Sequence, residues 1–380
     1  MRILIVSGSD ISRIGGVLVG IREVARRLVA RGDHCTVLSI NPGGLPKEDW
    51  IDGIHIIRVN SPISKFFLEM SPEIGRRFMS LVRTPPTPDI IHLHGYATLL
   101  SHELALLCKA GTRRYIYTPH YSPFAHIHPL GGLLFKLGRP AGSVVFGLAQ
   151  RVICISQFES DTVRNHFGVP PDKISIVPNG VDFIDHGSES GRIRNGTNPI
   201  RLLYVGYLIE LKGIQYILKA VQKLTIKMKL DVELVIAGSG YYEPVLRKLA
   251  NDLGIGKKVK WLGDVRKNDL IPLYRDADIS LLLSASENFG TVVAESLAVG
   301  TPAIVTTNSA LAEFVNERGC YGIENPSDAD RLADLILEIV GNGGGVGPLT
   351  NKIQTWDSVS GLIREVYSQA VCGPWNLKKS

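Results

Sequence analysis

The stretch Asp278–Gly300, DISLLLSASENFGTVVAESLAVG, decides the fold class of this chain. Its first residues are aliphatic and predict a buried strand, while the small apolar residues from about Gly290, ending at Gly300, predict a helix with a glycine stop. The polar residues between them form a loop. A buried strand that leads through a loop into a helix is the repeating unit of a doubly wound α/β domain.

The same alternation continues on both sides of this stretch. Short β-branched or aliphatic runs begin near residues 2, 35, 54, 89, 115, 151 and 174, and again near residues 200, 232, 259, 278 and 302. Continuous apolar runs separated by helices are typical of parallel strands that are buried on both faces. The sequence therefore predicts two Rossmann-like, doubly wound α/β domains.

Residues 185–199 interrupt the alternation. This segment, DHGSESGRIRNGTNP, is polar and rich in Gly and Ser, which indicates a linker. We therefore expect a first domain at residues 1–184, a linker at 185–199 and a second domain at 200–355. Residues 356–380 contain apolar residues at helical spacing, and we expect a helix there that packs back on the first domain.

The composition sets the broad class of protein. With 380 residues, 44% hydrophobic and 21% charged, the chain is expected to be globular and longer than one ordinary domain. Its five cysteines lack metal-type spacing, no apolar run reaches the roughly 18 residues of a membrane helix, and the first residues indicate a strand rather than a signal peptide. These features predict a reducing, cytoplasmic location. The net charge of +6 suits an anionic ligand, a membrane surface or nucleic acid without choosing among them.

Two carboxylates in the opening stretch, Glu287 and Glu295, need an explanation other than packing, because burying an unpaired charge costs several kcal/mol. In doubly wound sheets, ligands bind beyond the carboxyl ends of the strands, and the N–H groups near Phe289, Gly290 and Thr291 suit a phosphate. Glu295 lies further inside the helix, where a hydroxylated group such as ribose can reach it. The alternative is that Glu287 favours the positive helix end and Glu295 is exposed.

Two further strand ends carry candidate ligand-binding residues. In YVGYLIELKG, residues 204–213, Lys212 stands at the start of a helix, where it can donate to the same anion; the alternative is an ordinary solvated lysine. In SGSDISRIGGVLVG, residues 7–20, Gly15 and Gly16 open a helix and allow a ligand to approach the backbone closely. This segment lacks the Gly-x-Gly-x-x-Gly fingerprint of dinucleotide-binding domains.

In combination, these segments resemble the retaining family 4 glycosyltransferases. SENFGTVVAESLAVGTPAIVT is similar to the Glu-x7-Glu signature of that family, and VGYLIELKG to its Gly-Arg-Leu-x-x-x-Lys-Gly segment. VPNGVD (177–182), IGGV (14–17) and TPHY (118–121) resemble its inter-domain turn, its N-terminal Gly-Gly loop and its strand-end histidine. The resemblance covers nearly the whole chain. It implies a GT-B fold with two domains facing a central cleft, the nucleotide-sugar donor in the C-terminal domain and the acceptor on the N-terminal side.

The resemblance also implies roles for individual residues. Glu295 is expected to hold the ribose hydroxyls, Glu287 and the amides of residues 288–291 the donor sugar and diphosphate, and Lys212 the charge of the leaving diphosphate. The expected catalytic residues are Glu287, Lys212 and His120, of which His120 touches the donor sugar. The expected substrate-binding residues are Gly15, Gly16, Tyr207, Asn288, Phe289, Gly290, Thr291 and Glu295.

One position departs from the family pattern. The family usually has Arg after the first Gly of the lysine segment, whereas this chain has Tyr207, which carries no positive charge. The clamp on the leaving group is then either weaker or completed by another cation such as Arg13. We see no metal-coordinating acidic motif resembling Asp-x-Asp in the sequence, so we expect a metal-independent enzyme with no cofactor besides its nucleotide-diphosphate sugar substrate.

Two other classes of protein remain open. Histidines occur in pairs at His92 and His94 and at His126 and His128, with His120 between, and such pairs can ligate zinc in a metal-dependent hydrolase. No carboxylate or cysteine accompanies them at ligand spacing, and we expect His92 and His94 to point to opposite faces of their strand. The other alternative is a nucleotide-sugar epimerase or binding protein on the GT-B scaffold, because a fold does not determine a function.

The acceptor leaves weaker signals. Residues 63–83 place apolar residues at helical spacing beside basic ones, and such a face can lie on an anionic membrane, as a lipid-linked acceptor requires. The alternative, which we favour, is an amphipathic helix pair, broken at Pro72, that packs on its own sheet. Residues 131–150 are similarly ambiguous. We expect a glycan or lipid-linked acceptor and no nucleic-acid partner, and peripheral contact with the inner face of the membrane stays open.

Overall fold

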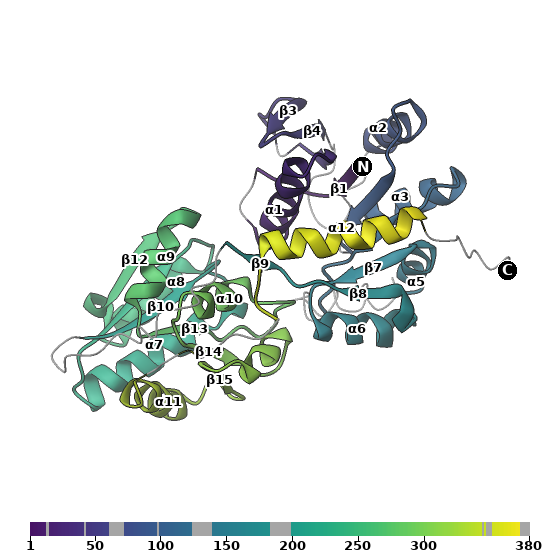
Figure 1. Ribbon diagram of the computed structural model, residues 1–380. Helices are drawn as coiled ribbons and strands as arrows, with labels where there is room; N and C mark the ends of the chain where they lie inside the picture. Colours follow the sequence, from purple (N-terminus) through teal and green to yellow (C-terminus); the bar gives the residue numbers. More distant parts are fainter. Residues whose placement is uncertain are drawn as a thin grey trace. The chain divides into compact units, whose positions relative to one another are not determined.

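The computed structural model describes residues 1–12, 15–41, 43–60, 72–96, 99–123, 139–182, 199–343, 346 and 352–372. The chain divides into two compact units (Figure 1), one formed by Met1–Gly180 and Trp356–Ser380 and the other by Val181–Thr355. Of the predicted linker, all but Pro199 lies outside the described residues. The C-terminal helix α12 (Trp356–Cys372) belongs to the first unit.

The first unit is built on an eight-stranded sheet with the order β3-β4-β2-β1-β5-β6-β7-β8. Its neighbouring strands are parallel except for the antiparallel pair β3 and β4. The strands are β1 (Arg2–Ser7), β2 (His34–Ile40), β3 (Glu48–Ile51), β4 (Ile54–Val59), β5 (Ile90–His94), β6 (Ile116–Thr118), β7 (Arg151–Cys154) and β8 (Ile174–Ile176). The seven strands expected from the apolar runs are present, and β3 was not predicted.

Helices cover both faces of this sheet, as the alternation of the sequence predicts. Ile3 and Ile5 of β1 pack in a core with α1 (Gly16–Ala30) and α12, whereas Leu4 and Val6 pack in the core on the opposite face. Alternate residues of one strand thus serve two cores, because successive side chains point to opposite faces. The second core is covered by α2 (Pro72–Arg83), α3 (Leu99–Ala110), α5 (Arg139–Leu148) and α6 (Gln157–Phe167).

The second unit is a six-stranded, fully parallel sheet with the order β12-β11-β10-β13-β14-β15. Its strands are β10 (Ile200–Val205), β11 (Val232–Ala237), β12 (Val259–Gly263), β13 (Ile279–Leu282), β14 (Ala303–Thr306) and β15 (Cys320–Ile323), of which β15 was not predicted. Its helices are α7 (Ile214–Gln222), α8 (Glu243–Asp252), α9 (Lys267–Asp276), α10 (Thr291–Ala298) and α11 (Ala329–Gly341). The short strands β9 (Gly180–Val181) and β16 (Gln354–Thr355) form a separate two-stranded sheet.

The order of the strands in the second unit reverses between β10 and β13. From this point the chain winds outward in both directions, and sheets of this kind form a ligand crevice outside the carboxyl ends of the two strands at the switch. Ligands of open α/β sheets bind at such a switch point. The loops that follow β10 and β13 carry Lys212 and Glu287, respectively.

The described part of the amphipathic segment 63–83 is α2, since residues 61–71 lie outside the described residues. Ile74, Phe78 and Val82 of α2 are almost fully buried in the core of the first unit. This packing agrees with the favoured alternative for this part of the segment. In the ranges that the structure describes, no helix combines the length and the hydropathy needed to cross a bilayer.

Candidate active site

Glu287 and Lys212 meet at the switch point of the second unit. The ammonium of Lys212 is paired with Oε1 of Glu287, and the hydroxyl of Ser284 donates to the same oxygen at 2.8 Å. The two charged side chains are 21% and 16% exposed, so their ion pair is partly shielded from water yet open to a ligand. The structure therefore brings together the expected lysine and the first expected glutamate, and it excludes the alternative of a solvated Lys212.

A glycine fixes the place of Lys212. Gly213 follows the short 3₁₀ turn Glu210–Lys212 with a φ of +75°, and a Cβ at this position would lie 2.1 Å from the carbonyl oxygen of Leu283. The amide of Ala285 donates to the carbonyl of Leu211 at 2.8 Å. The lysine loop thus lies directly against the end of β13, which only a residue without a side chain permits.

Replacing Gly213 with alanine is expected to destabilise the second unit by about 2 kcal/mol or more, through left-handed strain and steric overlap with backbone. Such a loss lowers the midpoint of thermal unfolding by roughly 4–8 °C for a unit of this size. Gly263→Ala is the matched control, because Gly263 has a φ of +66° with open space around it and should cost about 1–2 kcal/mol at most. Differential scanning calorimetry measures both, and equal midpoints for the two variants would contradict the close approach.

Glu295 lies on α10 and is half-buried, which contradicts the alternative of an exposed side chain. The hydroxyl of Tyr274 donates to its Oε2 at 3.1 Å. Burial raises the pKa of Glu295 to about 7. A carboxyl group that is poised between its two protonation states near neutral pH is more typical of functional sites than of surface glutamates.

The start of α10 presents backbone rather than side chains. Gly290 precedes the helix with a φ of +98°, and a Cβ there would lie 2.4 Å from Cδ2 of Leu311. Phe289 is 7% exposed, and its ring meets that of Phe314 edge-on, with the ring centroids 5.3 Å apart. Phe289, Gly290 and Thr291 can therefore reach a ligand through their amides, as expected for a phosphate at a helix N-terminus. Oδ1 of Asn288 is buried and accepts no hydrogen bond from the described residues.

Tyr207 lies near the start of the loop that follows β10, two residues after the strand ends. Its side chain is 46% exposed, and its carbonyl accepts a hydrogen bond of 2.8 Å from the buried hydroxyl of Tyr204. The phenol brings no positive charge to the crevice. Arg13, the other candidate cation, lies outside the described residues.

The second unit contains two Asp-x-Asp strings, at residues 276–278 and 328–330, and their carboxylates make structural contacts. Asp276 pairs with Arg201 at 2.9 Å, and Asp278 accepts from the amide of Arg201 at 2.8 Å, at the amino end of β13. Asp328 caps α11, and Asp330 pairs with Lys223. In the described residues, no group of three or more His, Cys, Asp and Glu side chains is placed to hold a metal ion.

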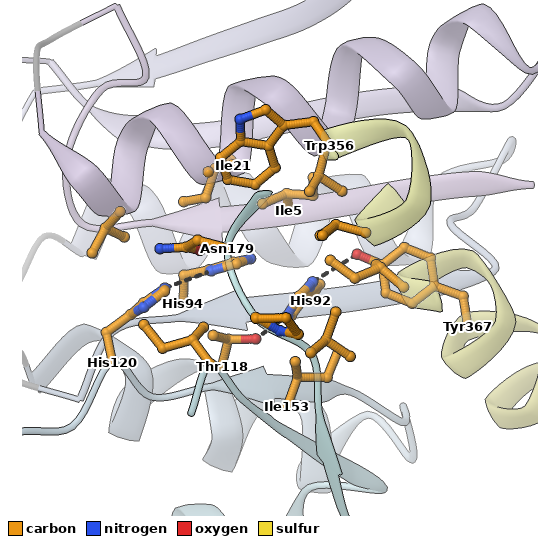
Figure 2. A pocket seen from close by; sticks show the side chains of 18 residues that line it. Ile5, Ile21, His92, His94, Thr118, His120, Ile153, Asn179, Trp356 and Tyr367 are labelled. Atoms are coloured by element: carbon orange, nitrogen blue, oxygen red, sulfur yellow. Dashed lines mark hydrogen bonds between the residues drawn. The ribbon is translucent and has the colours of Figure 1, made fainter. Parts of the chain in front are cut away.

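His120 lies in a pocket of the first unit together with two other histidines (Figure 2). Its Nε2 is 3.2 Å from Nδ1 of His94, and its backbone has an unusual φ of +50°. His92 lies deeper, with Nδ1 2.7 Å from the hydroxyl of Tyr367 and Nε2 2.8 Å from the hydroxyl of Thr118. Burial lowers the pKa of His120 to about 4, so its imidazole is neutral at pH 7.

The prediction that His92 and His94 point to opposite faces of β5 is wrong. Their ring centroids are 4.0 Å apart, because residues two positions apart in a strand share a face. These rings bond to Tyr367, Thr118 and His120 rather than to carboxylates or thiols. His126 and His128 lie outside the described residues.

Gly15 precedes α1, and Gly16 is the first residue of this helix. A Cβ at Gly16 would have no atom within 4 Å in the described structure, so packing does not require glycine at this position. Open space beside the first turn of a helix is consistent with a glycine that lets a ligand approach the backbone closely. This ligand-binding role stays a prediction.

Sequence reasoning missed the hydrogen-bond partners of the two glutamates. Ser284 lies in the same loop as Glu287, three residues before it, and its position offered a signal. Tyr274 and Lys267 lie seven positions apart on α9, which places them on one face of that helix. That spacing predicts a polar face on α9, but only tertiary packing decides that Glu295 lies next to this face.

The chain matches known proteins over nearly its whole length. Residues 14–183 match the family described as Glycosyltransferase Family 4, and residues 188–353 match the family described as Glycosyl transferases group 1. An uncharacterized glycosyltransferase of Methanocaldococcus jannaschii is 26% identical over 382 residues, which cover 94% of this chain and 95% of the relative.

Two solved structures share the fold. Sucrose-phosphate synthase from Thermosynechococcus elongatus has a TM-score of 0.81 at 19% identity, covering 97% of this chain and 98% of that structure. HepE from Anabaena, in complex with UDP and glucose, has a TM-score of 0.73 at 20% identity, with 97% and 99% covered. These two likenesses show the GT-B fold, and the two family matches, which lie one after the other along the chain, show that the chain belongs to glycosyltransferase family 4, a family of retaining, metal-independent enzymes that use nucleotide-sugar donors.

Proposed function

We propose that this enzyme transfers a hexosyl group from a nucleoside-diphosphate hexose to a hydroxyl of a glycan or lipid-linked acceptor. The observation that carries the proposal is the Lys212–Glu287 pair at the switch point of the second unit, beside the start of α10. A cation, backbone amides and a carboxylate at one crevice suit a ligand with a diphosphate and hydroxyl groups.

The chemistry of the reaction explains why these groups belong together. The bond between the anomeric carbon and the diphosphate oxygen breaks, negative charge grows on the diphosphate, and positive charge grows on the sugar. Lys212 and the amides of α10 stabilise the negative charge on the diphosphate. Preorganised groups of this kind usually make the largest contribution to catalysis. In this proposal Glu287 contacts the sugar, and the acceptor oxygen forms the new bond to the anomeric carbon on the same face as the leaving group, while its proton passes to the departing diphosphate oxygen.

The donor is proposed to carry UDP and a hexose such as glucose. HepE, which shares the fold, is known in complex with UDP and glucose, and this supports testing the same donor first. In this proposal Glu295 accepts hydrogen bonds from the ribose hydroxyls. His120 contacts the donor sugar as a neutral imidazole, which can either donate or accept a hydrogen bond according to its tautomer.

Family membership speaks against a zinc hydrolase, and the epimerase or binding protein is the alternative that needs a test. An epimerase consumes its nucleotide sugar without an acceptor, and a binding protein consumes none. A transferase releases the nucleoside diphosphate faster when the acceptor is added.

The enzyme is expected to form a product with the anomeric configuration of the donor and to keep its activity in EDTA. The expectation rests on Glu287 at the site and on the family to which the chain belongs. Proton NMR of the product anomeric signal after incubation with UDP-glucose and a mixture of glycan and lipid-linked acceptors measures the first point. An inverted product, or complete loss of turnover in EDTA that added Mg²⁺ restores, would contradict the proposal.

A further inference from the structure

A small pocket of the second unit lies beside Glu295. It contains two charged side chains that have no role in the proposed reaction. Its walls are apolar side chains of α9 and α10 together with Asp182, Lys267, Tyr274 and Glu295. The ammonium of Lys267 lies 2.9 Å from Oδ2 of Asp182. Both side chains are about one-third exposed, at 31% and 35%, so they are neither deeply buried nor fully solvated.

These groups are the charges that face Glu295 from the elements around it. Helix α10 packs against α9, β13 and β14. The strands β13 and β14 contribute no titratable side chain, because their sequences are ISLL and AIVT. Helix α9 contributes the cation Lys267 and the phenol of Tyr274, and the residue after β9 contributes the anion Asp182. Glu295 therefore stands under the influence of one cation and one anion.

We propose that Lys267 is a positioning residue for donor binding, which acts through Glu295 by favouring its carboxylate form, and that Asp182 opposes it. The proposal rests on the proposed function, in which Glu295 holds the ribose hydroxyls. A carboxylate accepts hydrogen bonds on both oxygens, whereas the protonated acid has one oxygen that donates instead. The charge of Glu295 consequently sets how well it can hold two hydroxyl groups at once.

The pKa of Glu295 supports this geometry. Burial raises it to about 7, Lys267 and the hydrogen bond from Tyr274 lower it, and Asp182 raises it. At neutral pH the carboxyl is therefore close to half ionised, where a nearby charge has its largest effect on the ionised fraction. Removing Lys267 moves the pKa of Glu295 further up, and removing Asp182 moves it down. Donor affinity follows the ionised fraction, so it falls as the pH is lowered through this range.

The first test reads the charge of Glu295 without any donor. Full-length protein labelled with ¹³C at the glutamate carboxyl is titrated by NMR, with Glu295→Gln identifying the signal. Lys267→Met is expected to raise the pKa of Glu295 by about half a unit and Asp182→Asn to lower it by a similar amount, as for screened charges at part-exposed positions. Lys267→Arg keeps the charge, and Lys248→Met removes an exposed lysine of α8, so neither substitution should change the pKa of Glu295.

The second test reads donor affinity with UDP as the probe, by isothermal titration calorimetry at pH 6 and pH 9. At pH 6, Lys267→Met should bind UDP about threefold more weakly than the parent and Asp182→Asn about threefold more tightly. At pH 9 Glu295 is ionised in each of these proteins, so the three affinities should agree.

The two tests separate the inference from the proposed function. If the pKa of Glu295 does not move in opposite directions in Lys267→Met and Asp182→Asn, the inference is overturned. If it moves as expected while the affinity for UDP does not follow, the placement of Glu295 at the ribose is overturned. A difference in affinity that persists at pH 9, in proteins with unchanged circular dichroism, would also overturn the inference, since Lys267 would then act independently of the charge of Glu295.

Discussion

Replacing Lys212 with alanine is expected to lower kcat by about 100- to 1,000-fold, the usual cost of removing one preorganised donor to developing charge. The loss should exceed the loss of donor affinity, because the charge on the diphosphate grows as the glycosidic bond breaks. Tyr207 stands where the family usually has an arginine, so in the proposed reaction we expect Lys212 to carry a larger share of the charge balance than in relatives with both cations. Steady-state kinetics with the donor as the varied substrate measure the effect.

Two control variants make this prediction specific. Lys212→Arg keeps the charge and should retain more activity than Lys212→Ala, while Lys248→Ala removes a lysine that is 79% exposed and should leave kcat unchanged. Tyr207→Arg should restore part of the activity of Lys212→Ala. A Lys212→Ala enzyme within about threefold of the parent would remove Lys212 from the site.

Glu287→Gln and Glu295→Gln are expected to impair different steps. Glu287 lies beside Lys212, where the reacting sugar binds in the proposed reaction, so its loss should lower kcat by about 100-fold with a small change in donor KM. Glu295 is expected to hold the ribose, whose contacts change little during the reaction. Its replacement should therefore raise donor KM by about tenfold, the cost of a charged hydrogen bond, and change kcat little.

The two substitutions are matched, because each replaces a glutamate by its neutral isostere within the same loop and helix. A double variant Lys212→Ala/Glu287→Gln should lose less than the product of the two single losses, since the side chains form one ion pair. Equal effects of the two glutamine variants on kcat and on KM would contradict the division of roles.

Much of the fold could be predicted because it depends on local patterns. Most parallel strands of the two large sheets are continuous apolar runs between helices, as in β1 and β10, and such runs stand out in any sequence. Two of the strands that were missed, β3 and β15, belong to the large sheets and lack this signal. β3 is an antiparallel edge strand with the sequence EDWI, and β15 has the sequence CYGI, in which a glycine weakens the strand pattern.

The site could be predicted in part for a related reason. Residues at the carboxyl ends of β10 and β13 are brought together by the topology itself, so Lys212 and Glu287 could be placed from their positions in the chain. The hydrogen bond of Glu295 with Tyr274 and its place in one pocket with Lys267 depend on how α9 packs against α10, which no local pattern determines. The histidines of β5 were misplaced through an error of strand geometry, although their spacing in the sequence was sufficient to place them on one face.

The central claim is that the crevice between β10 and β13 binds the nucleoside diphosphate of the donor through Lys212, Glu295 and the start of α10. Calorimetric titration of the parent enzyme with UDP, GDP and ADP tests it without knowledge of the acceptor. We expect one of the three to bind, with affinity reduced about tenfold in Glu295→Gln and unchanged in Lys248→Ala. Absence of binding by all three, or a nucleoside diphosphate that binds equally well to the parent, Glu295→Gln and Lys212→Ala, would contradict it.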